Sequence, residues 1–297
     1  MNTRRKVYLY TGGSIIFWAG SASAFKQALA SLTPVMLLWS ASLISLVVLA
    51  LLLTAQKQIS LLKSLKPGEW GGLLLLGVLN PFLYYIILFK AYALLPGQMA
   101  MSLNYLWPVV LALLSVPVLG HTLGWRNILA IGLSFTGALI IATRGEMLQL
   151  RGVSITGVVL ALASTVVWAF YWLLSARIQV AAIVKLFVGF LSGSLLTLIY
   201  ALFAPGSLLP PSGIPWLSML YVGLFEMGLT FFLWLKALQM ADNAARVGNL
   251  IYLTPFLSLF FLALLLDEPI YNSTLVGLLV IIAGILAQQY WSNRQPE

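Results

Sequence analysis

The sequence predicts an all-α integral membrane protein with ten transmembrane helices, arranged as two inverted five-helix repeats. Three observations support this expectation. Hydrophobic residues make up 61% of the 297 residues and charged residues only 8%, whereas soluble domains carry roughly 25% charged residues. Apolar runs of about 20 residues, long enough to cross the hydrocarbon core, follow one another with short breaks. The motif Tyr105-Leu106-Trp107-Pro108 returns later in the chain as Tyr252-Leu253-Thr254-Pro255.

Ten long apolar segments are expected to be the membrane helices. They are continuously apolar, which argues against a β-barrel, because barrel strands alternate over about ten residues. Proline and glycine mark the breaks between them, as at Pro34, Pro96-Gly97 and Pro269. The expected helices cover 8–28, 34–54, 70–94, 98–118 and 123–143 in the first half, and 152–176, 183–203, 213–239, 243–265 and 273–291 in the second.

The first segment also has features of a cleaved signal peptide. Three basic residues at 4–6 precede the apolar run, and Ala22-Ser23-Ala24 resembles a signal-peptidase site. Cleavage would remove the helix that pairs with the sixth helix by symmetry. We therefore interpret the segment as an uncleaved first span.

The duplication divides the chain into residues 1–147 and 148–297. Residues of the first part recur in order in the second, in the pairs Trp70 and Trp216, Gly77 and Gly223, and Lys90 and Lys236. Five helices are an odd number, so the second half must enter the membrane upside down relative to the first. Inverted repeats of membrane helices are the usual ground plan of alternating-access transporters.

The basic residues indicate the orientation of the chain. Cytoplasmic loops carry an excess of Lys and Arg, and most of these residues fall on one side if the N-terminus is cytoplasmic. Both termini are then cytoplasmic, and the net charge of +9 needs no nucleic-acid partner to explain it. The residues assigned to this side are Arg4, Arg5, Lys6, Lys57, Lys63, Lys66, Arg126, Arg177, Lys185, Arg246 and Arg294.

Several kinds of chemistry are missing from the sequence. It contains no cysteine and a single histidine, His121, so disulfides, thiolate metal sites and His-based metal clusters are excluded. A membrane enzyme acting on lipid or prenyl substrates usually needs clustered carboxylates, a His base or a metal. A channel needs a ring of charges or a carbonyl filter. Neither pattern is present, so we expect no enzyme, no metal and no cofactor.

Two helix faces carry matching hydroxyl and aromatic side chains. Hydroxyl groups find no partner in lipid, so these faces pack on another helix or line a cavity. The paired tryptophans and Tyr171 favour the cavity over simple serine-mediated packing. The two faces, each at helical spacing, consist of Ser14, Trp18, Ser21 and Phe25 in one helix, and of Ser164, Trp168, Tyr171 and Ser175 in the other.

Glu226 is the only acidic residue expected deep in the membrane. A charge there costs at least about 3 kcal/mol on insertion scales, so such a residue faces the protein interior. Its symmetry mate is Asn80, and Tyr84 and Thr230 lie one turn beyond the two on the same faces. Two interpretations remain open for Glu226: a buried carboxyl that orders the fold, or a cavity group that binds a substrate amine or carries a proton.

Prolines inside three expected spans are candidate hinges. Pro81, Pro108 and Pro255 each remove a backbone hydrogen bond and kink a helix. The aromatic residues next to the repeated Leu-x-Pro are expected to line the cavity, although Trp and Tyr also anchor spans at the membrane surface. These residues are Tyr105, Trp107 and Tyr252.

The chain resembles the EamA-like branch of the drug/metabolite transporter superfamily. The resemblance implies ten helices, a central cavity, export of amino acids or related metabolites, and a location in the bacterial inner (plasma) membrane. The density of Trp and Tyr makes the chain similar to the aromatic amino-acid exporters of that superfamily. One departure is Gly120-His121, where the family often has Gly-Glu. The matching motifs are Trp18-Ala19-Gly20, Trp168-Ala169, Lys90-Ala91, Lys236-Ala237, the two Leu-x-Pro and Asp267-Glu268-Pro269.

Together these observations predict an exporter of amino acids with aromatic or large apolar side chains. Aromatic walls supply apolar area and can face a cation, while a few polar groups hold the substrate ends. The partners expected are a small-molecule substrate and the lipid bilayer, with protons as candidate coupling ions, and a monomer suffices. The alternative is a nucleotide-sugar or drug carrier of the same fold. A phosphate would call for buried Arg or Lys, and no Arg is expected at mid-depth.

Overall fold

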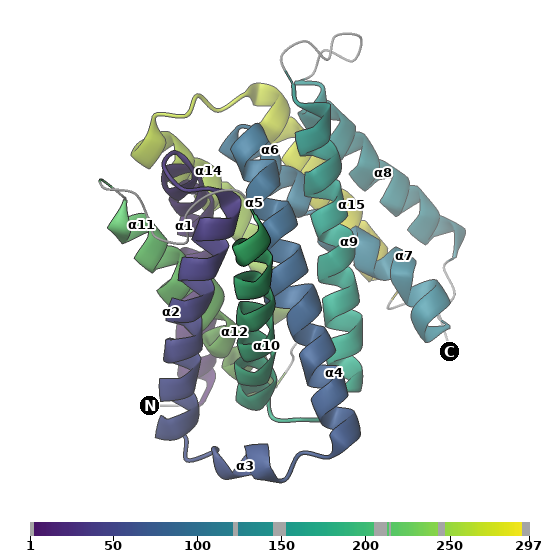
Figure 1. Cartoon of the computed structure of the whole chain (residues 1–297). Helices are drawn as coiled ribbons and strands as arrows, with labels where there is room; N and C mark the ends of the chain where they lie inside the picture. The colour runs from purple at the N-terminus through teal and green to yellow at the C-terminus, as the bar shows by residue number, and fades with distance from the viewer. Residues whose placement is uncertain are drawn as a thin grey trace.

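The computed structural model describes residues 3–120, 124–144, 153–204, 213, 215–242 and 247–292. His121, Arg246 and Arg294, considered above, lie outside these residues. All regular elements in the described ranges are helical (Figure 1). They are α1 (Thr3–Leu29), α2 (Pro34–Ala55), α3 (Ser60–Lys63), α4 (Pro67–Gly77), η1 (Val78–Leu83), α5 (Tyr84–Leu94), α6 (Gly97–Asn104), α7 (Trp107–Leu119), α8 (Trp125–Ala142), α9 (Ile155–Arg177), α10 (Ala182–Phe203), α11 (Trp216–Tyr221), η2 (Val222–Leu229), α12 (Thr230–Met240), η3 (Asn249–Leu253), α14 (Thr254–Leu266) and α15 (Asn272–Ser292).

Within the described ranges, nine helical segments are long and apolar enough to cross a membrane. The chain is therefore a multi-pass membrane protein. The helix expected at 8–28 is present as α1, with 27 residues, but it is not among the nine. Thr11, Ser14, Ser21 and Ser23 interrupt its apolar sequence, and all four are buried. Because α1 packs against α14 and α12, these polar side chains are covered by protein.

Two equivalent seams hold the bundle together. At one seam, α10 packs on α4 and η1; at the other, α2 packs on η2. Gly77 and Gly223 allow the close approach, because an added Cβ would lie 2.2 Å from the Gly189 carbonyl oxygen in the first case and 2.5 Å from Ile44 Cβ in the second. A serine hydroxyl reinforces the second seam, since Ser45 Oγ donates to the Gly223 carbonyl at 2.7 Å. Small residues and hydroxyl bonds are the usual means of helix association in membranes.

The helix expected at 70–94 is interrupted near its middle. The chain forms α4, then a π-helical turn, η1, and then α5. Asn80 has non-helical dihedral angles, φ −143° and ψ 119°. The break occurs because Pro81 has no N–H to donate and its ring clashes with the preceding turn. The helix expected at 213–239 is interrupted at the matching place by the π-helical η2, which contains Glu226 and no proline.

The two spans with the repeated Leu-x-Pro are interrupted as well. The span expected at 98–118 stops at Asn104 and resumes as α7, with Pro108 in its first turn. In the span expected at 243–265, the 3₁₀ segment η3 precedes α14, whose first turn contains Pro255. The expected break in the span is present next to both prolines, but it lies just before each proline rather than as a kink after it. Each begins a new helix, where proline is tolerated because its missing N–H is not needed.

The two ends of the bundle differ in charge. We call them the α3 end and the Glu268 end. The α3 end is at the bottom of Figure 1, and the connection around α3 carries Lys57, Lys63 and Lys66. The Glu268 end is at the top, where residues 267–271 link α14 to α15 and include Asp267 and Glu268.

Candidate functional site

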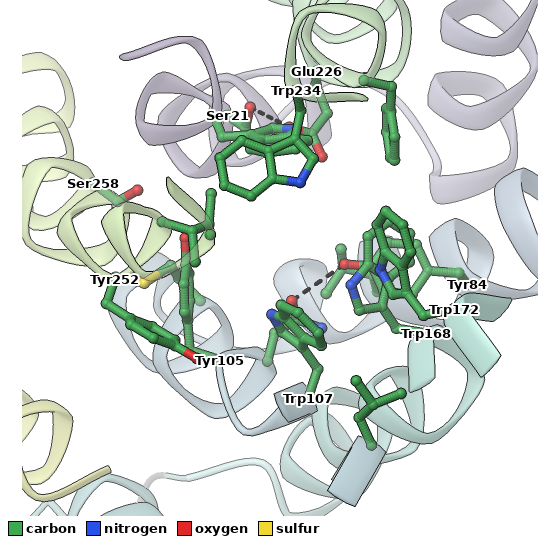
Figure 2. Close-up of a pocket in the computed structure, with 18 of the residues that line it drawn as sticks. Ser21, Tyr84, Tyr105, Trp107, Trp168, Trp172, Glu226, Trp234, Tyr252 and Ser258 are labelled. Atoms are coloured by element: carbon green, nitrogen blue, oxygen red, sulfur yellow. Dashed lines mark hydrogen bonds between the residues drawn. The ribbon is translucent and has the colours of Figure 1, made fainter. Parts of the chain in front are cut away.

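A cavity of about 740 Å³ lies between the two halves of the described chain (Figure 2). Its walls come from α1, α5, α6, α7, α9, η2, α12, η3, α14 and α15. The interruptions at 105–106 and in η2 and η3 adjoin it, so these helix breaks open space between the spans. Its aromatic lining residues are Trp18, Phe25, Tyr84, Tyr92, Tyr105, Trp107, Trp168, Trp172, Phe231, Trp234 and Tyr252.

Five of these rings form one connected wall across four helices. Tyr84 of α5 stacks on Trp168 of α9, with ring centroids 4.4 Å apart. Trp168 meets the edge of Phe231 of α12 at 5.7 Å. Phe231 and Trp234 each contact Trp18 of α1 at 5.6 Å, in edge-on arrangements. Stacked and edge-to-face pairs are the favoured aromatic geometries, so the wall is a packed surface that keeps its shape without a ligand.

Glu226 is the one charged side chain among the described lining residues. It is 7% exposed. Ser21 Oγ donates a hydrogen bond to its Oε2 at 2.5 Å, and Tyr85 Oη donates to its Oε1 at 2.9 Å. A carboxylate has about four acceptor positions, so capacity remains for a ligand. Figure 2 shows Glu226 beside Ser21 and Trp234 at the edge of the cavity.

A second polar group on the wall is centred on Asn104. Tyr84 Oη donates to Asn104 Oδ1 at 3.2 Å, and Asn104 Nδ2 donates to Ser164 Oγ at 2.8 Å. The chain of bonds links α5, α6 and α9. Asn104 is the last residue of α6, and the helix break after it frees its side chain to turn toward these neighbours.

The cavity extends toward the α3 end. It is lined there by Ala176 near the end of α9, by Leu238 near the end of α12, and by Gly248 before η3. Gln289, in the last turns of α15, lines the same part and donates from Nε2 to Tyr252 Oη at 2.7 Å. The inner part of the cavity therefore continues to the bundle end that carries the α3 lysines.

The Glu268 end is closed by hydrogen bonds between the two halves. The Glu268 carboxylate accepts from the backbone N–H groups of Gly97 and Gln98 at 3.1 and 3.0 Å, and from Gln98 Nε2 at 3.2 Å. Gln98 Nε2 also donates to the Pro269 carbonyl at 2.7 Å, and its Oε1 accepts from Tyr271 N at 3.0 Å. We call these bonds the latch. Lys26 adds bonds from Nζ to the carbonyls of residues 92 and 95, both at 3.0 Å.

The structure places most residues of the sequence-based site around the cavity. The residues found in its lining are Trp18, Ser21, Tyr84, Tyr105, Trp107, Trp168, Glu226 and Tyr252. Pro81 is buried within η1, outside the described lining, and Pro108 and Pro255 are likewise not lining residues. Whether any of these three acts as a hinge stays a prediction.

The expectation was wrong for Asn80, Tyr171 and Thr230, which are buried but do not line the cavity. Asn80 lies in the distorted turn packed on α10, and its buried side chain lies next to the Tyr171 hydroxyl. Tyr171 stacks behind Trp168 at 5.4 Å. Thr230 follows η2, whose π-helical winding takes more residues per turn, so a spacing of four no longer keeps it on the face of Glu226.

Several site residues were missed by the sequence reasoning. Phe231 and Trp234 share one face of α12 at a spacing of three, which is a signal that could have been used. Asn104 lies just before the Tyr-Leu-x-Pro motif. Its counterpart in the second repeat is not polar, so a comparison of the two repeats does not indicate Asn104 as a site residue. Tyr85 donates to Glu226 from outside the lining, and no spacing rule connects those two residues.

Comparisons with known proteins agree with this architecture. A model of the EamA-like transporter family matches residues 5–143 and again residues 155–287, which indicates internal duplication. The uncharacterized transporter YvbV of Bacillus subtilis (strain 168) is 26% identical over 290 residues, covering 91% of this chain and 87% of that protein. The aromatic amino acid exporter YddG of Ancylobacter novellus is 26% identical over 189 residues, covering 63% of this chain and 64% of the exporter. A solved crystal structure shares the fold with a TM-score of 0.69 at 23% identity, covering 97% of this chain and 98% of the other.

Proposed function

This chain belongs to the EamA-like transporter family, and from that premise we propose that it exports amino acids with aromatic or large apolar side chains, and related metabolites, by alternating access. As a member of a transporter family it is not an enzyme. The observation that carries the proposal is the cavity of about 740 Å³, walled by aromatic rings with Glu226 at its edge. Small-molecule sites are typically of this kind, about 300–1,000 Å³, mostly apolar and with few polar groups.

We propose that α1 is a tenth span. Its 27 residues correspond to about 40 Å of helix at 1.5 Å per residue, which is enough to cross the membrane. Its polar side chains Thr11, Ser14, Ser21 and Ser23 are buried, so they need not meet lipid. With α1 included, residues 1–147 and 148–297 contain five spans each.

An inverted relation between these two halves fits the packing. The second helix of the first half, α2, packs on η2 of the second half, and the second helix of the second half, α10, packs on η1 of the first. The exchange of partners is what a two-fold axis between the halves produces, and the odd number of spans in each half places that axis in the membrane plane. Because one chain supplies both halves of the cavity, a monomer is sufficient for transport.

The α3 end is proposed to face the cytoplasm of a bacterial cell, with the protein in the inner membrane and both termini inside. The argument is the positive-inside tendency of Lys and Arg. The α3 end carries Lys57, Lys63, Lys66, Arg177 and Lys185, whereas Lys26 and Arg144 lie at the Glu268 end. The cavity extends toward the α3 end and is latched at the Glu268 end. In this orientation the structure corresponds to the state that loads substrate from the cytoplasm.

Amino acids are favoured as substrates by the lining. Aromatic and large apolar side chains match the wall built on Trp18, Trp168 and Phe231, and Glu226 offers an anion to an amine. The similarity to an aromatic amino acid exporter points the same way. A nucleotide sugar would bring phosphates into this space, and the described lining contains no Lys or Arg to receive them.

Counterflow in proteoliposomes tests the proposal. Vesicles containing purified protein are loaded with one unlabelled amino acid and diluted into the labelled form, and a panel of aromatic, aliphatic, charged and small amino acids is compared. Uptake is expected for aromatic and large apolar amino acids above protein-free vesicles. Uptake of labelled nucleotide sugars without any amino-acid signal would reject the proposed substrate class. Repeating the assay with an imposed pH gradient determines whether protons are coupled.

A further inference from the structure

We infer that the cavity recognises its substrate as an amine cation, held by the Glu226 carboxylate within the aromatic wall, and that its described lining offers no equivalent site for a substrate carboxylate. Aromatic amines and esters of aromatic amino acids are therefore ligands at least as good as the amino acids themselves. This inference rests on the proposed function, because it concerns the same cavity. It adds which charged end of the substrate the cavity binds.

The charge balance of the described lining is the first argument. It contains one carboxylate and no ammonium, guanidinium or imidazole group. Hydrogen bonds from Ser21 and Tyr85 stabilise the Glu226 carboxylate, yet they are neutral donors and leave its charge uncompensated. Charged groups away from water are normally paired. A ligand ammonium would supply the missing partner, and a ligand carboxylate would add a second negative charge.

The surroundings of Glu226 are the second argument. Trp18 precedes Ser21 by three residues on α1, so its ring lies within one turn of the hydroxyl that bonds Glu226. Phe231 and Trp234 meet that ring at 5.6 Å. Aromatic faces attract cations, and the attraction grows when water is excluded. The same residues that would hold the apolar body of a substrate therefore also favour a positive charge.

The remaining polar groups do not form a carboxylate site. Such a site needs several convergent donors, as bidentate Arg pairs and backbone nests provide. The amide of Asn104 is bonded on both sides, to Tyr84 and to Ser164. Gln289 donates to Tyr252, in the part of the cavity near the α3 end. Asn104 and Gln289 lie on different helices, α6 and α15. Trp172 Nε1, a lining donor without a hydrogen-bond partner among the described residues, is a single N–H group rather than a convergent set.

A matched ligand series tests the inference by isothermal titration of the purified full chain in detergent. The series is phenylalanine, its methyl ester, phenethylamine and 3-phenylpropionate, which share one ring and differ in charged ends. The ester and phenethylamine are expected to bind with a Kd equal to or below that of phenylalanine, and 3-phenylpropionate at least 100-fold more weakly. Binding of 3-phenylpropionate as tight as that of phenylalanine, or failure of both amines to bind, overturns the inference.

Two variants refine the test. Glu226→Gln keeps the size of the side chain and should weaken phenethylamine at least tenfold. Asp242→Asn removes one negative charge from an exposed position outside the described lining and should leave its affinity unchanged. Unchanged phenethylamine binding in Glu226→Gln also overturns the inference. If Glu226→Gln does not fold, the ligand series on the unmodified chain still tests the inference.

Transport assays separate this inference from the proposed function. Counterflow of phenethylamine without counterflow of any amino acid would remove the proposed amino-acid export and leave the amine anchor standing. Counterflow of phenylalanine that neither phenethylamine nor the methyl ester inhibits would leave export standing and remove the inference.

Discussion

Replacing Gln98 by leucine should shift the protein toward the state that is open at the Glu268 end. Gln98 is fully buried, and its side chain makes three hydrogen bonds in the latch: to the Glu268 carboxylate, to the Pro269 carbonyl and from Tyr271 N. A neutral hydrogen bond contributes about 0.5–1.5 kcal/mol net, and one to a charged group about 1.5–3 kcal/mol. The lower values for two neutral bonds and one charged bond already give about 2.5 kcal/mol.

If the latch opens during transport, this free energy stabilises only the state in which the Glu268 end is closed. A differential of about 2.5 kcal/mol changes the ratio of two conformations by about 60-fold. The variant should therefore lose much of its population with an open α3 end. Leucine occupies a similar volume, so the local packing of α6 is largely preserved.

Cysteine reactivity measures this shift directly. The chain has no cysteine, so a single Leu111→Cys in α7, which lines the cavity, gives a clean reporter. In inverted membrane vesicles, an impermeant maleimide should label it quickly in the otherwise unmodified protein and at least tenfold more slowly with Gln98→Leu. Gln56→Leu is the matched control, because Gln56 bonds only the Leu52 carbonyl of its own helix among the described contacts. An equal labelling rate in the Gln98→Leu and control proteins would refute the assignment of the latch to one state.

Three further predictions concern packing, the polar chain beside the cavity and orientation. Gly77→Ala should destabilise the fold by about 1–3 kcal/mol or more through overpacking, seen as a lower melting temperature, while Gly12→Ala, whose Cβ meets nothing within 4 Å, should have little effect. Asn104→Leu should weaken phenylalanine binding about tenfold, because Tyr84 loses its acceptor and the wall loses its order; unaltered affinity in a titration would contradict this. A reporter fused after Glu297 should be active in the cytoplasm, and a periplasmic reporter would reverse the proposed orientation.

The sequence was most informative where a chemical rule has few exceptions. Hydroxyl groups cannot be left in lipid, and this rule alone directed Ser21 and Ser164 toward protein, where both are found buried. An acid deep in the membrane must face inward, as Glu226 does. The same polar residues explain why α1 falls short in apolar composition although it lies inside the bundle.

Predictions that assumed regular winding were less successful. Pro81 is a sequence signal for the helix break at η1. The segment η2 has no such signal, because the chain is π-helical around Glu226 without a proline. A face inferred at 3.6 residues per turn therefore misplaced Thr230. Asn104 and Tyr85 become site residues only because helices from distant parts of the sequence bring acceptors to them. Such long-range pairings are absent from any local pattern.

The duplicated halves are chemically unequal at their two ends, and this inequality bears on which state is stable. The spacing of 147 between Tyr105 and Tyr252 puts Gln98 in correspondence with Ala245, and Glu268 in correspondence with His121. Ala245 and His121 lie outside the described residues, but their side chains differ in kind: alanine has no amide, and histidine has no carboxylate. If the two halves had identical sequences, the same hydrogen bonds could close either end of the bundle. Of these corresponding positions, those at the Glu268 end carry the amide and the carboxylate that make the latch, so these bonds favour closure of that end, and substrate binding or an ion gradient would supply the free energy for the opposite state.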